Sequence, residues 1–250
     1  MIDFHTHILP GIDDGSANVE ESTQLLIREL QQGVAHVVFT PHFYAEKISI
    51  GGFLKKREAS WNSLRERIGK EEEVSGMTFR LGAEVRYFPG ISKAERLDEL
   101  LVRDRNLLLL EMPFMPWTKE MRKDVENLLD QRGFTVVLAH IERYVEFQKS
   151  KENKDVMESI FRMPVVKQMN AGALLNSGKA GFFGGAGKGK SQKFILKYLE
   201  EHTDGVLSSD CHHLDRRFPN LGDGMAFVEK KLGREKREQM EALGKRLFFE

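Results

Sequence analysis

Histidine and acidic residues recur at the ends of hydrophobic runs along this chain. The first run leads into His5-Thr6-His7, and six later runs, typical of buried strands, each end in a residue that could bind a metal or a substrate. Imidazole and carboxylate groups are ligands that zinc, manganese and iron accept in proteins. The pattern therefore predicts a metal centre assembled from residues far apart in the sequence. The later run ends are His42, Glu84, Glu111, His140, Asn170 and the pair Asp210 and His212.

Amphipathic segments separate the strand-like runs and predict helices. A first helix is expected over residues 17–32, with Ser16 at its N-cap and Gly33 at its end. Strand followed by helix, seven times over, predicts parallel strands joined by crossover helices, and hence an α/β fold with residues 1–250 in a single domain. In a barrel of parallel strands the functional side chains gather at the C-terminal strand ends. The other expected helices cover 54–69, 93–102, 119–132, 151–161, 191–202 and 225–246, the last of them broken near Gly233.

Side-chain alternation makes a further prediction about the strand ends. Every second side chain of a strand shares a face, so Asp3, His5 and His7 are expected to point one way, and Asp210 to point away from Cys211. Carboxylates gathered without a counter-charge would raise one another's pKa values. Divalent cations between them would remove that repulsion.

The composition excludes some classes of function. Lys and Arg total 38, as do Asp and Glu, so no overall charge favours a nucleic acid or a membrane surface. A single cysteine allows no disulfide within the chain, which is typical of a reducing compartment. No apolar run approaches the roughly 20 residues that cross a bilayer, and the first residues lack the pattern of a signal peptide. We therefore expect a cytoplasmic protein with no membrane insertion and no nucleic-acid partner.

Two other motifs compete with the metal centre. Residues 184–191 match the phosphate-binding pattern G-x-x-x-x-G-K-S/T, but segment 177–183 separates them from the preceding strand, whereas a P-loop follows its strand directly. Cys211 and Arg217 match the C-x5-R signature of cysteine-dependent tyrosine phosphatases, but no glycine lies between them and Asp215 would oppose a bound phosphate. We favour a solvated loop for 177–190 and expect activity to be independent of Cys211.

The ordered motifs resemble those of the PHP (polymerase and histidinol phosphatase) superfamily, and within it the bacterial manganese-dependent protein-tyrosine phosphatases of the CpsB/YwqE type. The resemblance extends from residue 1 to at least residue 220. It implies a distorted (β/α)7 barrel of the PHP fold, three divalent metal ions (manganese, with iron or zinc as alternatives) and hydrolysis of phosphotyrosine. The matching motifs are His5-Thr6-His7, Asp13-Asp14-Gly15, Thr40-Pro41-His42, Gly82-Ala83-Glu84, Leu110-Glu111-Met112-Pro113, Ala139-His140-Ile141-Glu142-Arg143 and Ser209-Asp210-Cys211-His212.

The resemblance also implies a role for each residue of the site. Arg143 and Arg217 would bind the phosphate oxygens, and the implied protein partner is the tyrosine-rich tail of a bacterial tyrosine autokinase that controls polysaccharide export. Two alternatives stay open: a small-molecule phosphatase of the same superfamily, similar to histidinol phosphatase, and a non-catalytic, metal-stabilised binding module. The implied ligand sets are His5, His7, Glu84 and Asp210 for one metal, Glu84, Glu111 and His140 for a second, and Asp14, His42 and His212 for the third.

The leaving group bears on which residues matter most. The phenol of tyrosine has a pKa near 10, so a phenolate beside a metal leaves with little help from an acid. We therefore expect none of Asp13, His213 and Asp215 to be as important as the metals and the arginines. Most aromatic residues after the strands are expected to pack over the barrel mouth; they are Phe43, Tyr44, Tyr87, Phe88, Phe114, Trp117, Tyr144 and Phe218.

Overall fold

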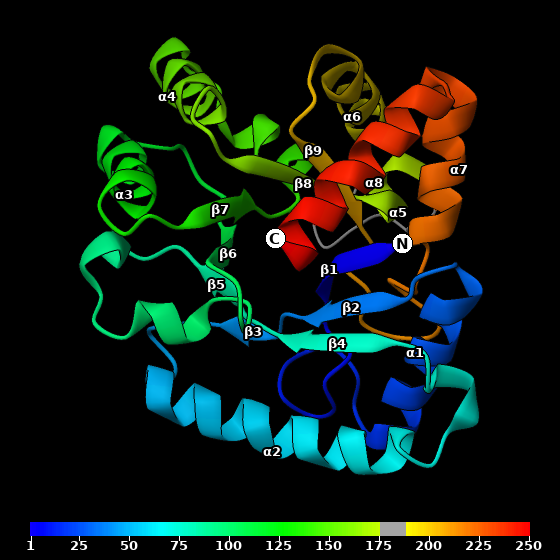
Figure 1. The fold of residues 1–250 in the computed structure, drawn as a ribbon. Coiled ribbons are helices and arrows are strands. Elements are labelled where there is room, and N and C mark those ends of the chain that lie inside the picture. The colour runs from blue at the N-terminus through cyan, green and yellow to red at the C-terminus, as the bar shows by residue number, and fades with distance from the viewer. Residues whose placement is uncertain (176–188) are drawn as a thin grey trace.

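The strands of this protein pair in parallel within two sheets, in a computed structural model that describes residues 1–175 and 189–250 (Figure 1). One sheet has the order β1 (Ile2–Thr6), β2 (His36–Phe39) and β4 (Thr78–Leu81). The other has the order β3 (His42–Phe43), β5 (Glu84–Arg86), β6 (Leu107–Glu111), β7 (Thr135–Leu138), β8 (Val166–Asn170) and β9 (Gly205–Ser208).

The two sheets join into one ring. Only two residues separate β2 from β3, and two separate β4 from β5, so each pair forms one bent barrel strand. Between the last and first strands, the N–H of Asp210 donates to the carbonyl of His5, and the N–H of His7 donates to the carbonyl of Cys211, both at 2.9 Å. These contacts confirm the α/β class and the distorted seven-stranded barrel.

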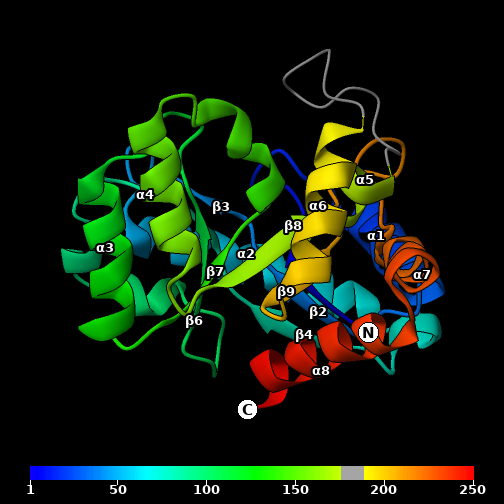
Figure 2. The same cartoon turned by 90° about the horizontal axis from the view of Figure 1, so that it is seen from above.

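A hydrophobic core fills the inside of the barrel. Leu243 and Phe248 of α8 (Arg234–Phe249) belong to it and close its floor. Figures 1 and 2 show α8 beside the N-terminus, where β1 begins. The ring of Phe248 packs edge-on against Phe4, with 6.4 Å between the ring centroids. The strand side chains of this core include Phe4, Val38, Leu107, Leu109, Val137, Val166 and Val206.

Truncating Phe248 to alanine is expected to lower the free energy of unfolding by about 3 kcal/mol, because it leaves a cavity in the barrel floor. Phe248 is 3% exposed, whereas Phe249 beside it is 52% exposed. Phe249→Ala is therefore a matched control, with an expected loss below about 1 kcal/mol. Urea unfolding followed by circular dichroism measures both variants. Equal losses at the two positions would contradict the role of α8 as the floor.

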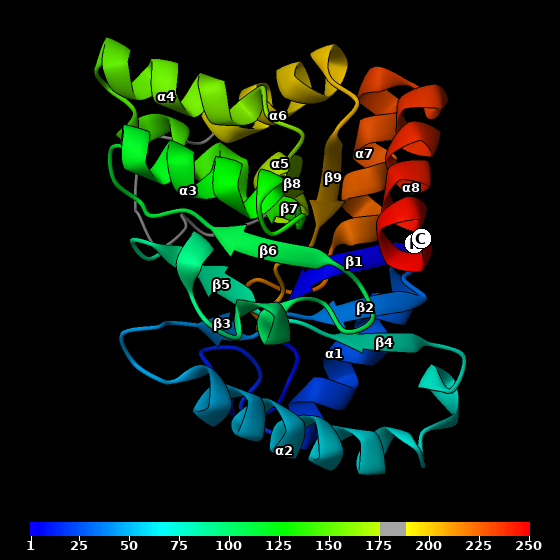
Figure 3. The same ribbon diagram turned by 60° about the vertical axis from the view of Figure 1, so that its left-hand side comes forward.

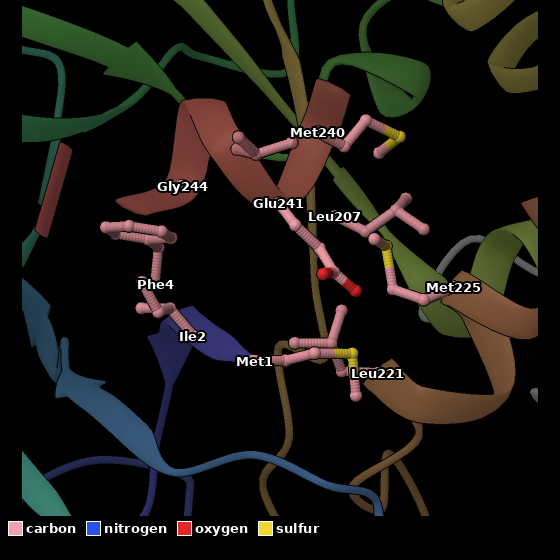
Figure 4. Close-up of a pocket in the computed structure, with 10 residues that line it drawn as sticks. Met1, Ile2, Phe4, Leu207, Leu221, Met225, Met240, Glu241 and Gly244 are labelled. Carbon is pink, nitrogen blue, oxygen red and sulfur yellow. The ribbon is translucent and has the colours of Figure 1, made fainter. Parts of the chain in front are cut away.

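A small cavity of about 30 Å³ lies beside this floor, between β1, β9, α7 (Leu221–Leu232) and α8 (Figure 4). It has room for about one water molecule. Figure 4 shows mainly apolar side chains around it, with Glu241 at its edge. The strand residues that line this cavity come before the histidine and acidic residues at the strand ends. The cavity is therefore separate from those residues, and we regard it as a packing defect. Its lining includes Ile2, Phe4, Val206, Leu207, Met225 and Met240.

Helices cover the outside of the barrel. In Figure 3, α1 (Val19–Gln31) and α2 (Ile50–Ile68) lie on one side of the strands, and α3 (Lys119–Asp130) and α4 (Lys151–Phe161) lie on the other. The short α5 (Ala171–Leu175) and α6 (Lys190–Glu201) precede β9. The expected helical break is confirmed, because α7 and α8 meet at Gly233, which has a positive φ of 91°.

Two expectations about helices are wrong. Residues 93–102 form no α-helix; two short 3₁₀ turns, Ile91–Lys93 and Leu97–Leu100, cover parts of this segment. Arg96 between them has a φ of 60°, and Leu97 and Leu100 are fully buried, so packing overrides helical propensity here. The N-cap of α1 is Asn18 instead of Ser16, because the Asn18 side chain accepts the N–H of Glu21.

An irregularity in β1 changes which side chains face the site. The pairing of β1 with β2 shifts register between Asp3 and Thr6, which marks a β-bulge. Asp3 therefore faces Glu29 of α1, outside the barrel, whereas His5 faces Glu84. The prediction that Asp3 shares a face with His5 and His7 is wrong, because strict alternation does not continue through a bulge.

Two expectations concern whole segments. Among the described residues, no helix has both the length and the apolar composition that a membrane span requires. Most of the glycine-rich segment 177–190 lies outside the described residues, and so does most of the pattern at 184–191. Of that pattern the structure describes residues 189–191, at the start of α6.

Candidate metal centre

Glu84 lies at the centre of a cluster of histidines. Its Oε2 is 3.2 Å from Nε2 of His5, 3.3 Å from Nε2 of His7 and 2.8 Å from Nδ1 of His42. Its Oε1 is 2.9 Å from Nε2 of His140. Glu84 is buried at the start of β5, so these four imidazoles surround a carboxylate that water does not reach.

A second carboxylate completes the first group of ligand atoms. Oδ1 of Asp210 lies 3.5 Å from Nε2 of both His5 and His7, and the two Nε2 atoms are 3.1 Å apart. With Glu84, these are the four residues that the resemblance assigns to one metal. The structure brings them together from β1 and the residue that follows it, from β5, and from the segment after β9.

The other residues of the site form two neighbouring groups. Oδ1 of Asp14 is 3.3 Å from Nε2 of His42 and 3.5 Å from Nε2 of His212. Oε1 of Glu111 is 3.6 Å from Nε2 of His140. All nine candidate ligands therefore meet in one site. The sets whose ligand atoms lie within 4.8 Å of one another are His7, Asp14, His42 and His212; His5, His7 and Asp210; and His42, Glu84 and Glu111.

The donor atoms in this site fit divalent cations. Several are buried yet have no hydrogen-bond partner, and two of them, Oε2 of Glu84 and Nδ1 of His42, face each other at 2.8 Å. Buried polar atoms are normally hydrogen-bonded, and leaving them unpaired costs free energy. A cation bound between the facing lone pairs would remove that cost. The unpaired atoms of the site are Oε2 of Glu84, Oε2 of Glu111, Nδ1 of His42, Nδ1 of His140 and Nε2 of His212.

Outer hydrogen bonds fix the orientation of two histidines. The Nδ1–H of His7 donates to Oδ2 of Asp13 at 2.7 Å, and the Nδ1–H of His5 donates to Oε1 of Gln168 at 3.1 Å. In the neutral imidazole that a metal binds, each bond keeps the proton on Nδ1 and leaves Nε2, which faces the carboxylates, as the ligand atom. Carboxylate or amide partners of this kind orient metal-binding histidines. Asp13 therefore lies behind His7, where it also accepts the N–H of His42 at 2.9 Å.

Asp13→Asn is expected to weaken manganese affinity about 10- to 100-fold, because the amide neither carries the charge nor fixes the His7 tautomer. Isothermal titration of metal-free protein with Mn²⁺ measures the change. Asp215→Asn, at an exposed position after the site, is the matched control. An affinity unchanged by Asp13→Asn would show that this carboxylate does not orient a ligand.

Sequence patterns missed the role of Gln168 in β8. Its Oε1 accepts the backbone N–H of His140 at 2.7 Å as well as the Nδ1–H of His5. Its amide group donates to Asn170 at 2.8 Å, and Asn170 in turn donates to Oδ2 of Asp210 at 2.7 Å. One chain of amides thus connects three candidate ligands. Alternation places Gln168 and Asn170 on one face of β8, but that pattern does not identify their partners on the neighbouring strands.

Backbone strain is concentrated at this site. His140, Asp210 and Arg217 all have positive φ, at 32°, 53° and 51°. Such conformations are costly for residues with a side chain and persist where the surrounding structure enforces them, often at functional sites. Gly15 is also required here, because a Cβ at that position would lie 2.1 Å from the carbonyl oxygen of His7. The sequence Asp13-Asp14-Gly15 can therefore approach His7 closely.

Charges within the site set its pKa values. Burial lowers the pKa of His5, but Glu84 and Asp210 outweigh it and raise the value to about 9. Burial and the charge of Glu84 raise the pKa of Glu111 to about 7. For Glu84 and Asp210 burial acts upward as well, yet the cations beside them, His5 and Arg217, hold both pKa values well below the usual range. The expected mutual increase is confirmed for Glu111 and wrong for the other two.

Arg143 and Arg217 both reach the same carboxylate. Nη2 of Arg143 is 3.3 Å from Oδ2 of Asp210, and Nη2 of Arg217 is 2.6 Å from Oδ1. Each side chain is 37% exposed, so both guanidinium groups lie where the buried site meets solvent. Arg216, the residue before Arg217, is exposed and contacts His213 at 3.4 Å.

Six of the eight aromatic residues after the strands pack in the hydrophobic core. Phe43, Tyr87, Trp117 and Tyr144 are buried, and the partly buried Phe88 and Phe114 pack against the same core. The hydroxyl of Tyr144 accepts the N–H of Met112 at 3.0 Å, which ties together the loops after β6 and β7. These aromatic residues therefore stabilise the loops that surround the candidate metal centre.

Cys211 faces away from the candidate ligands, as alternation predicted. Its Sγ is 3.3 Å from Oε1 of Glu29, and burial and the charge of Glu29 raise the pKa of the thiol well above its usual value. A buried thiol of this kind is a poor nucleophile. Cys211→Ser is therefore expected to keep any turnover per folded molecule within about threefold. A loss as large as that caused by a chelator, measured on p-nitrophenyl phosphate, would instead favour a cysteine mechanism.

Comparison with known proteins places this geometry in context. Residues 1–244 match the sequence profile of the family described as "Capsular polysaccharide synthesis, CpsB/CapC". Tyrosine-protein phosphatase CpsB from Streptococcus pneumoniae is 28% identical over 251 residues, which cover 96% of this chain and 94% of the relative. Tyrosine-protein phosphatase YwqE from Bacillus subtilis strain 168 is 26% identical, with 94% and 86% covered.

Solved structures share the fold. A structure reported for YwqE from B. subtilis and CpsB from S. pneumoniae, described as metal-dependent tyrosine phosphatases, superposes with a TM-score of 0.80 at 24% identity, over 99% of this chain and 94% of the other. An organophosphorus hydrolase from Deinococcus radiodurans has a TM-score of 0.53 at 13% identity, with 100% and 92% covered. Because the profile match covers nearly the whole chain, the chain belongs to the CpsB/CapC family of capsular polysaccharide synthesis.

Proposed function

We propose that this protein is a metal-dependent protein-tyrosine phosphatase that acts in capsule or exopolysaccharide synthesis. The observation that carries the proposal is the convergence of five histidines and four carboxylates on one site, with two arginines at its edge. The names of the relatives, tyrosine-protein phosphatases, support the same activity. The family's place in capsular polysaccharide synthesis supports the biological context.

The proposed cofactor is a cluster of three divalent cations, taken to be manganese. Mixed imidazole and carboxylate ligands suit manganese, and accept iron or zinc as well. Bound cations would lower the pKa of a water molecule toward neutrality and neutralise charge on the attacking and leaving oxygens. The proposed sets are His5, His7, Glu84 and Asp210 for one cation, Glu84, Glu111 and His140 for the second, and Asp14, His42 and His212 for the third.

Arg143 and Arg217 bind the phosphate in this proposal. Both guanidinium groups are partly exposed and contact Asp210, so they can turn from that carboxylate to the substrate's phosphate oxygens. The planar fork of arginine donates two hydrogen bonds to a phosphate group. Asp13 and His213 are occupied by His7 and Glu21, so neither is placed to protonate the leaving phenolate. The low pKa of a phenol makes a strong acid unnecessary.

The proposed substrate is a phosphotyrosine protein in the cytoplasm, the tyrosine-rich tail of a bacterial tyrosine kinase. The phosphatase names of the relatives and the capsule context support this assignment. The half-exposed arginines at the mouth of the site also suit a phosphate carried on a protein surface.

Hydrolysis of p-nitrophenyl phosphate with added Mn²⁺ tests the enzyme class directly. Turnover that a chelator abolishes is expected, whereas no turnover with Mn²⁺, Fe²⁺ or Zn²⁺ would favour a binding module. A phosphotyrosine peptide is then compared with histidinol phosphate. A higher kcat/KM for histidinol phosphate would favour the small-molecule phosphatase instead.

A further inference from the structure

Two cations near the site, Lys47 and Arg86, have no part in the mechanism proposed above. Both lie over the ring of Tyr44, with Nζ of Lys47 4.1 Å and Cζ of Arg86 5.6 Å from the ring centroid. The ring of Tyr44 in turn stacks on His42, at 5.1 Å between centroids and 25° between planes. We call Tyr44, Lys47 and Arg86 the cationic rim. Because His42 is a candidate metal ligand, the rim adjoins the metal centre.

The backbone fixes the positions from which both side chains extend. The N–H of Lys47 donates to the carbonyl of Tyr44 at 2.9 Å, which closes a turn after β3. Arg86 ends β5, in register with Glu111 of β6. Lys47 is exposed, and Arg86 and Tyr44 are half-buried, so the rim faces solvent.

No carboxylate in the described part of the chain forms an ion pair with Lys47 or Arg86, whereas Arg143 and Arg217 both contact Asp210. The charge of Arg86 acts on Glu111, whose pKa it lowers, without direct contact, and in the proposed metal centre Glu111 is a ligand of a cation. The nearest acidic residue in sequence, Glu46, is exposed and pairs with neither cation. An aromatic ring attracts a cation without cancelling its charge. The rim therefore keeps two positive charges available to a ligand.

The cationic rim and the phosphate-binding arginines lie at different parts of the barrel mouth. β3 and β5, which carry the rim, are neighbours in the ring. Arg143 follows β7 and Arg217 follows β9, which are farther along the strand order. A phosphate held by the two arginines thus leaves the rim free for other groups of the same substrate.

We propose that the cationic rim is a subsite for an aspartate or glutamate that flanks the phosphotyrosine of a peptide substrate. The proposal rests on the phosphatase function proposed above and adds a substrate preference to it. Exposed ion pairs contribute modestly, so two of them would raise kcat/KM for an acid-flanked peptide about fivefold. The effect acts mainly on KM, because the charges attract ground state and transition state alike. It weakens as salt screens the charges.

Phosphate release from matched peptides tests the subsite. The manganese-loaded protein is given phosphotyrosine peptides that differ only in glutamate or glutamine on both sides of the phosphotyrosine. Wild-type protein is expected to prefer the glutamate peptide about fivefold at low salt. Arg86→Gln and Lys47→Gln should each reduce that ratio about twofold, and the double variant should bring it to about one. Arg86→Lys, which keeps the charge, should retain the preference.

A control variant separates this effect from overall charge. Arg65 is exposed on α2 and forms no ion pair in the described structure, so Arg65→Gln removes the same charge elsewhere and should leave the ratio unchanged. A wild-type ratio of one, or a preference that survives in the double variant, would overturn the subsite. If wild-type protein also failed to hydrolyse p-nitrophenyl phosphate, the proposed function itself would fall, and the subsite with it.

Discussion

Glu84→Gln is expected to lower kcat/KM for a phosphotyrosine peptide by on the order of 10³ or more, since metal chemistry contributes several kcal/mol to the transition state. Glu84 lies within 3.3 Å of nitrogen atoms of His5, His7, His42 and His140. The amide keeps the shape of the side chain but removes the negative charge that two cations would share. The value of kcat/KM for the peptide and the metal content measured by mass spectrometry should therefore decrease together.

Two controls make the Glu84 result specific. Glu73→Gln changes the same residue type at an exposed position on a 3₁₀ turn, and should leave activity and metal content unchanged. Treatment of the wild-type protein with a chelator should reproduce the loss, and Mn²⁺ should restore activity. Full activity in Glu84→Gln, with the metal content of the wild-type protein, would refute the proposed metal centre.

Arg217→Ala is expected to lower kcat/KM by about 10², because a charge-assisted hydrogen bond to phosphate contributes about 1.5–3 kcal/mol. A comparable loss is expected for Arg143→Ala. The effect should appear with p-nitrophenyl phosphate as well as with peptides, since both carry the phosphate group. Steady-state kinetics at saturating Mn²⁺ measures it.

Arg216 provides the matched control for these arginines. It is exposed beside Arg217 and contacts only His213 among the described interactions. Arg216→Ala should change kcat/KM less than about twofold, as a surface substitution. If Arg216→Ala were as damaging as Arg217→Ala, the phosphate-binding role of Arg217 would lose its support.

Much of the architecture follows from local patterns. Continuous apolar runs such as Leu107–Leu110 indicate strands buried on both faces, and the helices between them force a parallel arrangement. Since parallel strands end at the same edge, the histidines and carboxylates at their ends had to converge. The structure brings all nine candidate ligands together, and their role as ligands stays a prediction.

What sequence patterns missed depends on tertiary contacts. The bulge in β1 separates Asp3 from His5, and alternation alone contains no signal for a shift in register. The segment around Arg96 has helical composition, yet the burial of Leu97 and Leu100 imposes a different path. The chain of amides through Gln168 depends on three strands meeting, so a single strand does not reveal it.

The meeting of β9 with β1 has a thermodynamic consequence. His5 and Asp210 lie on opposite sides of this seam, joined by a backbone hydrogen bond at 2.9 Å, and in the metal-loaded protein proposed here they would share one cation. Binding of this cation and closure of the barrel between β9 and β1 are then linked. An ion that binds only the closed ring stabilises that ring by mass action. Amide protons along this seam should thus exchange more slowly with deuterium as free manganese increases.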